Sequence, residues 1–509
     1  MKGKRASGIL LPVTSLPSKY GIGCFSEEAY SFVDFLKKAK QKYWQILPLG
    51  QTGYGDSPYQ SFSTFAGNPY FIDLDEFVKR GYLTKESLDG TDFGSDPMYV
   101  DYGQIYRVRF GLLKEAYHNS PYAEKPDGKW SESCYDGERK DFEEFTEKEK
   151  SWLLDYALFS AIKAQEGGRC FIKWPEKLRT RQPEAIREAK EKFSDEIRFY
   201  EFQQYFFFRQ WMALKSYANR NEVEIIGDIP IYVAFDSADT WSHPELFKLD
   251  EKGYPTVVAG CPPDGFSATG QLWGNPIYKW AYHKETHFAW WMERLRNCFR
   301  LYDVVRIDHF RGFDEYYEIP YGDPTAENGK WVKGPGYDLF AELKKQLGNK
   351  RIIAEDLGYL TPSVIKLVKK TGYPGMKVLQ FAFDSREESD YLPHNYQANC
   401  VVYTGTHDNE TMHGWYLDVN HNDKRFARKY VGITCPAKAT LCFIRVAFMS
   451  VADTAIIPIQ DWLNLGNEAR INHPSTLGGI NWRWRLVPGQ LTDELAEKIA
   501  DMTVTYGRG

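Results

Sequence analysis

The segment 303–313, DVVRIDHFRGF, carries the residue types best suited to chemistry. Its apolar run is typical of a β-strand, in which alternate side chains face opposite sides. Arg306 and Asp308 therefore lie on the same face of the predicted strand. An arginine two residues before an aspartate keeps the carboxylate ionised by Coulomb attraction and hydrogen bonding, which makes Asp308 a candidate nucleophile. The alternative is a structural ion pair at the end of a strand.

Further acidic groups stand at the ends of other predicted strands. Asp228 belongs to GDIP, Glu355 to AEDLG, and His407 and Asp408 to GTHDNET. Parallel strands that end at one rim would bring these side chains into one cavity. Because uncompensated buried charges are costly, such a set is better explained by catalysis than by structure. Paired carboxylates without a cofactor motif are what cleavage of a glycosidic bond requires.

Composition and motifs exclude several other classes of function. A net charge of −5 provides no basic surface for nucleic acid or for an anionic membrane. The sequence has no phosphate-binding glycine loop, no H-E-x-x-H and no Cys/His cluster, and Arg306 among the carboxylates argues against a metal ion. We therefore expect no cofactor and no metal. The sequence carries no signal for the oligomeric state.

Cysteine usage and the amino-terminal residues bear on the compartment. The 8 cysteines are scattered without a C-x-x-C pair, which favours free thiols in a reducing cytosol and predicts a cytoplasmic protein. The start of the chain, MKGKRASGILLPVTSLP, is typical of neither a signal peptide nor a membrane span.

The elements that would position these residues are eight short apolar segments. They are predicted as strands at Gly8–Leu16, Tyr43–Leu49, Val223–Val233, Val304–Asp308, Lys350–Leu357, Met376–Phe381, Cys400–His407 and Asp453–Gln460. Helices are predicted near 26–41, 201–220, 286–300, 337–347, 362–371, 436–450 and 492–504, with Ser26 and Thr361-Pro362 at two starts and Gly372 at one end.

This alternation predicts an α/β fold, a single catalytic (β/α)8 TIM barrel over residues 1–509. An open doubly wound sheet is the rival, but no G-x-G-x-x-G turn follows an early strand. Residues 50–200 are predicted as an inserted loop and helical subdomain between strands two and three, with helices near 104–118, 140–166 and 184–199. Residues 234–285 are predicted as a loop insertion after strand three. Both would emerge on the carboxyl-terminal face, and no carboxyl-terminal β-sandwich domain is expected.

Long motifs in this sequence resemble one enzyme family. They are GDSPYQSFSTFAGNPY (55–70), GDIPIYVAFDSADTW (227–241), AGCPPDGFSATGQLWGNPIY (259–278), RIDHFRG (306–312), AEDLG (354–358), GTHDNET (405–411) and NWRWRL (481–486). The chain resembles the 4-α-glucanotransferases, glycoside hydrolase family 77, also called amylomaltases or disproportionating enzymes. The resemblance implies transfer of a segment of a 1,4-α-glucan to the 4-hydroxyl of an acceptor by a retaining double displacement. Maltooligosaccharides and 1,4-α-glucans would be the partners.

The resemblance also implies a role for each carboxylate. Asp308 would be the nucleophile, Glu355 the general acid and base, and Asp408 the stabiliser of the transition state. Glu355 must begin protonated, so we expect its pKa to be raised by desolvation and acidic neighbours, whereas Arg306 keeps Asp308 charged. The residues expected to contact sugar are Tyr59, Asp228, Phe266, Trp273, Asn275, Arg306, Asp384 and His407, with Tyr59 and Trp273 as stacking platforms.

Two other functions remain open at this stage. One is an α-glucan hydrolase of the amylase clan, which would share the first half of the reaction. The other is a catalytically silent glucan-binding protein, which the intact carboxylates argue against. The loops 258–275 and 50–70 are expected to cover the cavity and to exclude water, which favours transfer.

Overall fold

The computed structural model describes residues 5–53, 55–123, 136–263, 267–358 and 360–509. Its centre is a parallel sheet of eight strands in the order β10-β11-β12-β1-β2-β3-β6-β9. The strands are β1 (Ala6–Leu10), β2 (Tyr43–Gln45), β3 (Glu224–Ile229), β6 (Val304–Ile307), β9 (Ile352–Ala354), β10 (Gly375–Val378), β11 (Cys400–Tyr403) and β12 (Thr454–Pro458). The Ala354 N–H donates to the Pro374 carbonyl at 2.9 Å and bridges the remaining gap between β9 and β10. The sheet is therefore a nearly closed barrel, which confirms the predicted fold class.

Each predicted strand corresponds to one barrel strand, but most of the observed strands are shorter. The predicted strand Gly8–Leu16, for example, leaves the sheet after Leu10 and continues into a 3-10 turn at Val13–Ser15. Asp308 directly follows β6 and Glu355 directly follows β9, whereas Asp228 is the fifth residue of β3. The carboxylates with a possible catalytic role therefore stand at or just past the strand ends.

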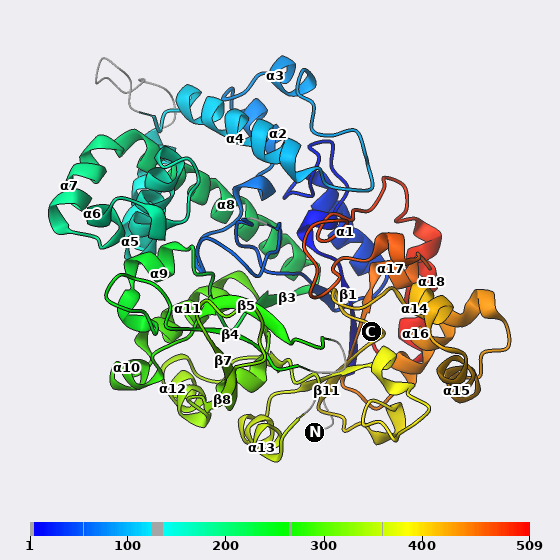
Figure 1. Cartoon of the computed structure of the whole chain (residues 1–509). Coiled ribbons are helices and arrows are strands. Elements are labelled where there is room, and N and C mark those ends of the chain that lie inside the picture. Colours follow the sequence, from blue (N-terminus) through cyan, green and yellow to red (C-terminus); the bar gives the residue numbers. More distant parts are fainter. Residues whose placement is uncertain (1–4, 54, 124–135, 264–266, 359) are drawn as a thin grey trace.

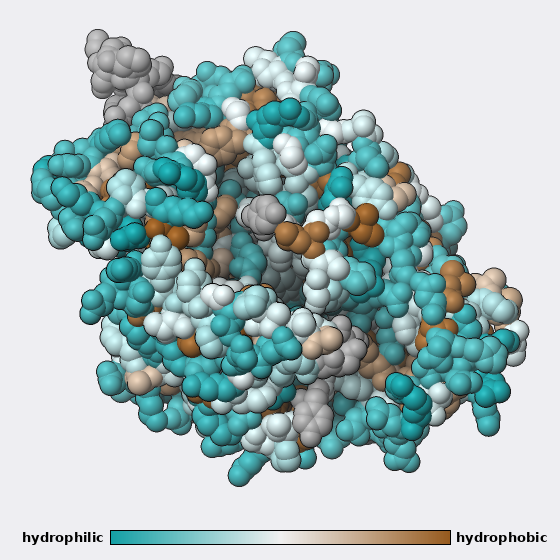
Figure 2. Space-filling view, viewed as in Figure 1, coloured by the Kyte–Doolittle hydropathy of each residue, from teal (hydrophilic) through white to brown (hydrophobic). Residues whose placement is uncertain are grey.

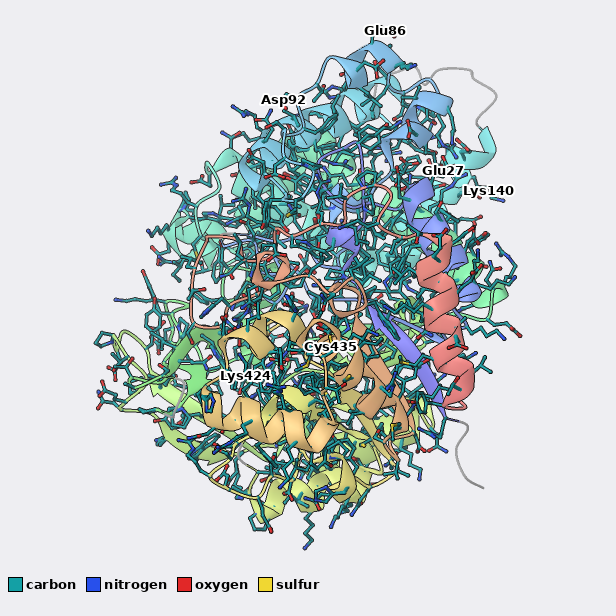
Figure 3. The ribbon with its side chains drawn as sticks, turned by 90° about the vertical axis from the view of Figure 1, so that its right-hand side faces the viewer. Glu27, Glu86, Asp92, Lys140, Lys424 and Cys435 are labelled. Carbon is teal, nitrogen blue, oxygen red and sulfur yellow. The ribbon has the colours of Figure 1, made fainter. Side chains whose placement is uncertain are left out.

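Helices surround the barrel and form the region above it (Figure 1). They are α1 (Glu27–Lys38), α2 (Leu74–Lys79), α3 (Lys85–Asp89), α4 (Tyr102–Asn119), α5 (Asp136–Gln165), α6 (Glu176–Arg179), α7 (Pro183–Lys192), α8 (Ser194–Arg220), α9 (Ala238–Ser242), α10 (Trp280–Glu285), α11 (Ala289–Leu301), α12 (Tyr337–Leu347), α13 (Pro362–Thr371), α14 (Met412–Asp418), α15 (His421–Val431), α16 (Ala439–Met449), α17 (Ile459–Trp462) and α18 (Asp493–Thr505). The amino-terminal α1 and the carboxyl-terminal α18 pack side by side (Figure 3).

The sequence placed one helix boundary wrongly. Two helices were predicted at 184–199 and 201–220, whereas α8 runs without a break from Ser194 to Arg220. The segment contains no glycine or proline, so nothing in the backbone interrupts it. At α13 the prediction is confirmed, because Gly372 adopts φ 75° after the helix and its N–H bonds the Val368 carbonyl.

A second sheet, not foreseen from the sequence, lies beside the barrel. It has four antiparallel strands in the order β5-β4-β7-β8, with β4 at Val257–Cys261, β5 at Gln271–Pro276, β7 at Glu315–Pro320 and β8 at Lys330–Lys333. The expected loop 234–285 thus contributes two strands. The pairing of β4 with β7 joins residues at least 57 positions apart, for example Gly260 with Tyr317, which a local pattern does not reveal.

Alternation along β6 decides which side chains enter the barrel. Val304 packs in the interior cluster with Ile226 and Ile353, whereas Val305 and Ile307 face the outer helices. Arg306 consequently points inward, as the two-residue period requires. On the neighbouring β3, the backbone at Gly227 lies against the Tyr302 ring: a Cβ there would be 2.1 Å from Tyr302 Cγ.

The part of the chain after β12 is helical and irregular. Within residues 459–509, all of them described, α17 and α18 are present and no named strand occurs. Of the described helices, none alone has the length and apolar composition to cross a membrane; the pair His421–Val431 and Pro436–Met449, bent by 72°, meets that test when taken together.

Candidate active site

A cavity of about 620 Å³ opens at the carboxyl ends of the barrel strands. Asp308 and Asp408 line it, together with Tyr59 from the first insertion and Trp273 and Asn275 from the second. The space-filling view of this face is hydrophilic over most of its area and hollowed near its centre (Figure 2). The strands thus deliver carboxylates to one cavity whose walls come from the two inserted segments.

Arg306 and Asp228 form the buried base of the site. Arg306 Nη1 lies 2.8 and 2.6 Å from the two carboxylate oxygens of Asp228, and both residues are almost fully buried. These two residues are register partners on the adjacent strands β6 and β3. Arg306 Nη2 also lies 3.0 Å from Asp308 Oδ1. One buried guanidinium therefore serves two carboxylates, and its principal partner is Asp228.

This arrangement corrects the expected effect of Arg306 on the Asp308 pKa. Burial raises the Asp308 pKa to about 6, with Asp228 and Asp408 adding to the rise, while Arg306 lowers it. The Arg306 contact was predicted, but its effect does not outweigh desolvation, because the same cation is shared with Asp228. Asp308 is still ionised at pH 7, by a narrower margin than the sequence suggested.

Glu355 is held beside Asp308 by the backbone of the neighbouring strand. Its Oε2 accepts the His309 N–H at 2.7 Å, and its Oε1 accepts the Leu357 N–H at 2.8 Å. His309 adopts φ 52° immediately after β6, and this left-handed turn directs its N–H toward the carboxylate. The Phe310 N–H bonds the Glu355 carbonyl at 3.0 Å, so side chain and backbone of Glu355 are both fixed.

The proton affinity of Glu355 agrees with the prediction. Burial, and next the charge of Asp308, raise its pKa to about 7, whereas Arg306 and the His309 and Leu357 amides act in the opposite direction. Glu355 thus has the higher proton affinity of the two coupled carboxylates. A neighbouring pair with one proton between them has the protonation state that acid catalysis needs.

Asp408 is more open than the other two carboxylates. Its side chain is 43% exposed, its Oδ2 lies 3.4 Å from His407 Nε2, and its Oδ1 accepts the Asn472 amide at 2.7 Å. Arg470 donates to the Asp408 carbonyl at 2.8 Å. Arg470 was not identified from the sequence, because it is 62 positions away and no strand pattern leads to it.

Tyr59 is tied into the same network. Its hydroxyl donates to Asp228 at 2.8 Å and lies 2.9 Å from His407 Nε2. The Tyr59 and His407 rings are nearly parallel, at 14°, with centroids 5.3 Å apart. Desolvation raises the Tyr59 pKa well above its usual value, so this hydroxyl stays protonated. Tyr59 therefore connects the first insertion to the base of the site.

Of the remaining residues predicted to contact sugar, some line the cavity and one does not. Trp273 Nε1 donates to Gln271 at 3.0 Å and its ring meets His309 edge-on, while the Asn275 amide donates to the Val233 carbonyl at 2.8 Å; both residues line the cavity. Asp384 does not line it. Its carboxylate instead pairs with Arg386 at 2.6 and 2.9 Å, which lowers its pKa to about 2. Phe266 lies outside the described residues.

Among the described residues, no group of three or more His, Cys, Asp and Glu side chains is placed to hold a metal ion.

The chain is similar in sequence and in fold to known proteins over nearly its whole length. The sequence model of glycoside hydrolase family 77, described as 4-alpha-glucanotransferase, matches residues 11–491. The 4-alpha-glucanotransferase of Streptococcus pneumoniae is 50% identical over 507 residues, covering 99% of this chain and 98% of that one. That of Thermus thermophilus is 48% identical over 509 residues, 99% of each. A solved structure, the amylomaltase from Streptococcus agalactiae in complex with acarbose, is 42% identical with a TM-score of 0.94, covering 99% of this chain and 100% of that one.

Proposed function

This chain belongs to the 4-alpha-glucanotransferase family, and we propose that Asp308, Glu355 and Asp408 carry out its glycosyl transfer on 1,4-α-glucans. The chain is a glycosyl-transferring enzyme, and the names of its relatives do not favour the hydrolase alternative. Each chemical step is assigned to one of two carboxylates, Asp308, which lines the cavity, or Glu355, which is bonded to the backbone of His309 in its wall.

The first half of the reaction opens the glycosidic bond. Glu355 gives its proton to the departing glycosidic oxygen while an Asp308 carboxylate oxygen attacks the anomeric carbon. The bond from that carbon to the leaving glucan breaks, a β-glucosyl ester of Asp308 forms, and the released chain carries the proton as a new 4-hydroxyl. In the second half, Glu355 removes the proton from the 4-hydroxyl of an acceptor, whose oxygen displaces Asp308.

The observation that carries this proposal is the clamp on Glu355. Both its oxygens accept backbone N–H groups, from His309 and Leu357, and His309 directly follows Asp308 in the chain. The charge of Asp308 adds to the rise in the Glu355 pKa. A retaining mechanism needs two carboxyl groups about 5–5.5 Å apart, one protonated and one not.

The other residues of the cavity supply substrate contacts in this proposal. Asp408, the open carboxylate, accepts hydrogen bonds from ring hydroxyls of the sugar in the transition state. His407 and Asp228 also bind that sugar. Tyr59 and Trp273 present aromatic faces to the apolar C–H face of glucose units. The remaining candidates for contact with the glucan are Asn275, Arg306, Asp384 and Phe266.

Exclusion of water supports transfer over hydrolysis. The β-glucosyl ester is consumed by whichever hydroxyl reaches it first, so the enzyme must favour a glucan over water. Segments from both insertions line the cavity: Tyr59 and Gln60 belong to the first, and Leu272 and Trp273 to the second. We propose that the insertions 50–200 and 234–285 act as the walls that hold an acceptor chain and exclude water.

The described cysteines are free thiols, which supports a reducing compartment, the cytoplasm.

Incubation with maltotriose tests the reaction itself. We expect a ladder of longer maltooligosaccharides together with glucose and maltose, resolved by chromatography of the products. Glucose and maltose alone, without longer products, would show that water takes the glucosyl group and would contradict the transfer proposal.

Replacement of Asp308 by Asn tests the nucleophile. Loss of a covalent nucleophile raises the barrier by more than about 4 kcal/mol, so kcat on maltotriose should fall at least about 10³-fold. Asp338→Asn is the matched control, because Asp338 is half exposed and pairs only with the exposed Lys284 among the described residues. Asp308→Asn activity within tenfold of the parent enzyme would rule out this role.

Azide separates the roles of the two carboxylates. With α-glucosyl fluoride as donor, Asp308→Gly plus azide should yield β-glucosyl azide, because azide then attacks the donor directly. Glu355→Ala plus azide should yield α-glucosyl azide, because azide then displaces the ester of Asp308. NMR of the anomeric proton distinguishes the products, and exchanged configurations would reverse the two assignments.

A further inference from the structure

A second cavity, of about 540 Å³, lies between the first insertion and the segments that follow β3. Its walls come from α5, from the segment 238–246 around α9, and from α10 and α11. Figure 1 shows α5 and α9 as neighbours on the left of the molecule, with α11 below them. No residue that lines this cavity also lines the active-site cavity.

Aromatic rings form the floor and rim of this second cavity. The Phe65 ring stacks on Trp152 at 16°, with centroids 6.1 Å apart, and meets Trp290 edge-on at 6.3 Å. Trp152 is fixed further, because its indole N–H donates to Glu149 at 2.9 Å. Tyr282 lines the cavity from α10 and is 36% exposed. Phe65 and Trp152 are each 9% exposed and form the rigid floor, so the exposed Tyr282 and the partly buried Trp290 present most of the accessible ring surface.

Charged groups on the walls are prearranged and paired. Arg300 pairs with Glu149 and donates to Asn297 at 2.9 Å. Asp155 pairs with Arg181 at 2.6 Å. The lining side chains comprise five carboxylates, three cations and one histidine, namely Glu149, Asp155, Asp239, Glu245, Glu293, Lys148, Arg296, Arg300 and His243.

These features select a class of ligand. The cavity has no excess of cations for a phosphate, and its walls are too charged for a lipid chain. A neutral ligand with an apolar face and many hydroxyls fits both the aromatic rings and the charged groups. The rings would contact its C–H face, and the paired charges would hydrogen-bond its hydroxyls. Its volume lies within the range of about 300–1,000 Å³ typical of small-molecule sites. Carbohydrate has this chemistry.

We propose that this second cavity, the distal glucan cleft lined by Phe65, Trp152, Tyr282 and Trp290, binds a segment of 1,4-α-glucan away from the active site. The inference rests on the proposed function for the choice of an α-glucan among carbohydrates. The same loop joins the two cavities, since Tyr59 lines the active site and Phe65, six residues on, lines the distal cleft. A long glucan held at the cleft raises its own effective concentration at the active site.

The distal cleft should therefore act on long substrates and not on short ones. Maltotriose fills the active site without reaching the cleft, so its turnover needs only the catalytic cavity. Amylose can occupy both places at once. Weakening the cleft should raise KM for amylose about tenfold and leave kcat on maltotriose within twofold.

Two variants test the distal cleft in different ways. Tyr282→Ala removes an exposed ring from the rim, and Ser151→Trp adds bulk from the exposed face of α5 into the same space. Neither residue belongs to the catalytic cavity. Tyr321→Ala is the matched control, because Tyr321 is a tyrosine of similar exposure, 47%, that lines none of the described cavities. Both test variants should show the amylose-selective rise in KM, and the control should not.

Direct binding provides the second measurement. In the Asp308→Asn background, calorimetric titration with maltoheptaose should show two sites, of which Tyr282→Ala or Ser151→Trp removes one. A single site in Asp308→Asn, or an unchanged KM for amylose in both variants, overturns the inference. An equal loss on maltotriose and amylose overturns it as well, because the residues would then act through the active site. Failure of the unaltered enzyme to elongate maltotriose would instead contradict the proposed function alone.

Discussion

At the scale of single residues, the proton affinities of the site depend on how the buried Arg306 guanidinium is shared between two carboxylates. Arg306 pairs with Asp228 through both carboxylate oxygens and with Asp308 through one contact. Since Asp228 takes the larger share, burial prevails at Asp308 and Glu355, and both pKa values rise. The pair can thus exchange roles between acid and base close to neutral pH.

The pH dependence of activity should follow from these two shifts. Asp308 must be deprotonated, so kcat/KM should rise with pH through about 6, and Glu355 must be protonated, so it should fall above about 7. The two apparent values belong to the coupled pair, and a bell-shaped profile on maltotriose measures them. With α-glucosyl fluoride, whose leaving group needs no acid, Glu355→Gln should lose the alkaline limb of the first step. Retention of that limb would assign it to another group.

Asn472 should act as a positioning residue for Asp408. Its amide donates to Asp408 Oδ1 at 2.7 Å, so Asn472→Ala leaves that carboxylate free to turn. We expect kcat to fall about 10–100-fold with a smaller change in KM, because misplacement of a catalytic group acts on the transition state. The control is Asn328→Ala, which removes a similar amide contact to Asp323 at an exposed site. Equal KM and kcat effects would indicate ground-state binding instead.

At the scale of elements, the barrel strands place the carboxylates and the insertions enclose them. Alternation along β6 directs Arg306 inward, and the left-handed turn at His309 lets its N–H reach Glu355. The neighbouring β3 supplies Asp228 directly after Gly227, where the Tyr302 ring approaches the backbone. The geometry of the site therefore depends on close packing behind the strands.

Substitution of Gly227 tests that packing. The Cβ of Gly227→Ala would lie 2.1 Å from Tyr302 Cγ, so the strand or the ring must move. We expect the free energy of unfolding to fall by about 1–3 kcal/mol, measured by urea denaturation, with reduced kcat because Asp228 shifts as well. Gly111→Ala in α4 is the control, since nothing lies within 4 Å of its added Cβ. It should stabilise the protein by about 0.5–1 kcal/mol.

At the scale of the whole molecule, Arg508 near the carboxyl-terminal end of the chain bonds to the start of β1. The buried Arg508 guanidinium donates to the carbonyls of Phe448 at 3.0 Å, Ala6 at 3.1 Å and Ser450 at 3.2 Å. It thereby joins the start of β1 to the end of α16, while α18 packs on α1. This clamp is remote from the catalytic cavity and should serve stability alone.

Removal of the clamp should separate stability from activity. Arg508→Ala removes the buried hydrogen bonds to the Ala6, Phe448 and Ser450 carbonyls, of which the last two still accept from Arg5, so we expect the free energy of unfolding to fall by about 1–3 kcal/mol. The kcat on maltotriose at 25 °C should stay within twofold. Arg425→Ala, at an exposed position of α15, is the control and should change stability by less than about 0.5 kcal/mol. Loss of activity in folded Arg508→Ala would show that this clamp does control the site.

The sequence by itself determined the barrel, the identity of the catalytic candidates and their shared rim. Those features rest on local signals: a two-residue strand period, apolar segments of strand length, and acidic groups at the strand ends. Arg306 beside Asp308 was predicted for this reason, and the raised pKa of Glu355 was expected from the role that the family resemblance implies; the structure agrees with both.

Only the tertiary structure decided how these parts interact. The principal pairing of Arg306 with Asp228, the hydrogen bonds of Asn472 and Arg470 to Asp408, and the pairing of β4 with β7 join residues from 57 to 78 positions apart. The raised pKa of Asp308 depends on desolvation, which no sequence pattern measures. Contacts between distant segments and the depth of burial are set when the whole chain packs, because only then are the neighbours of each charge fixed.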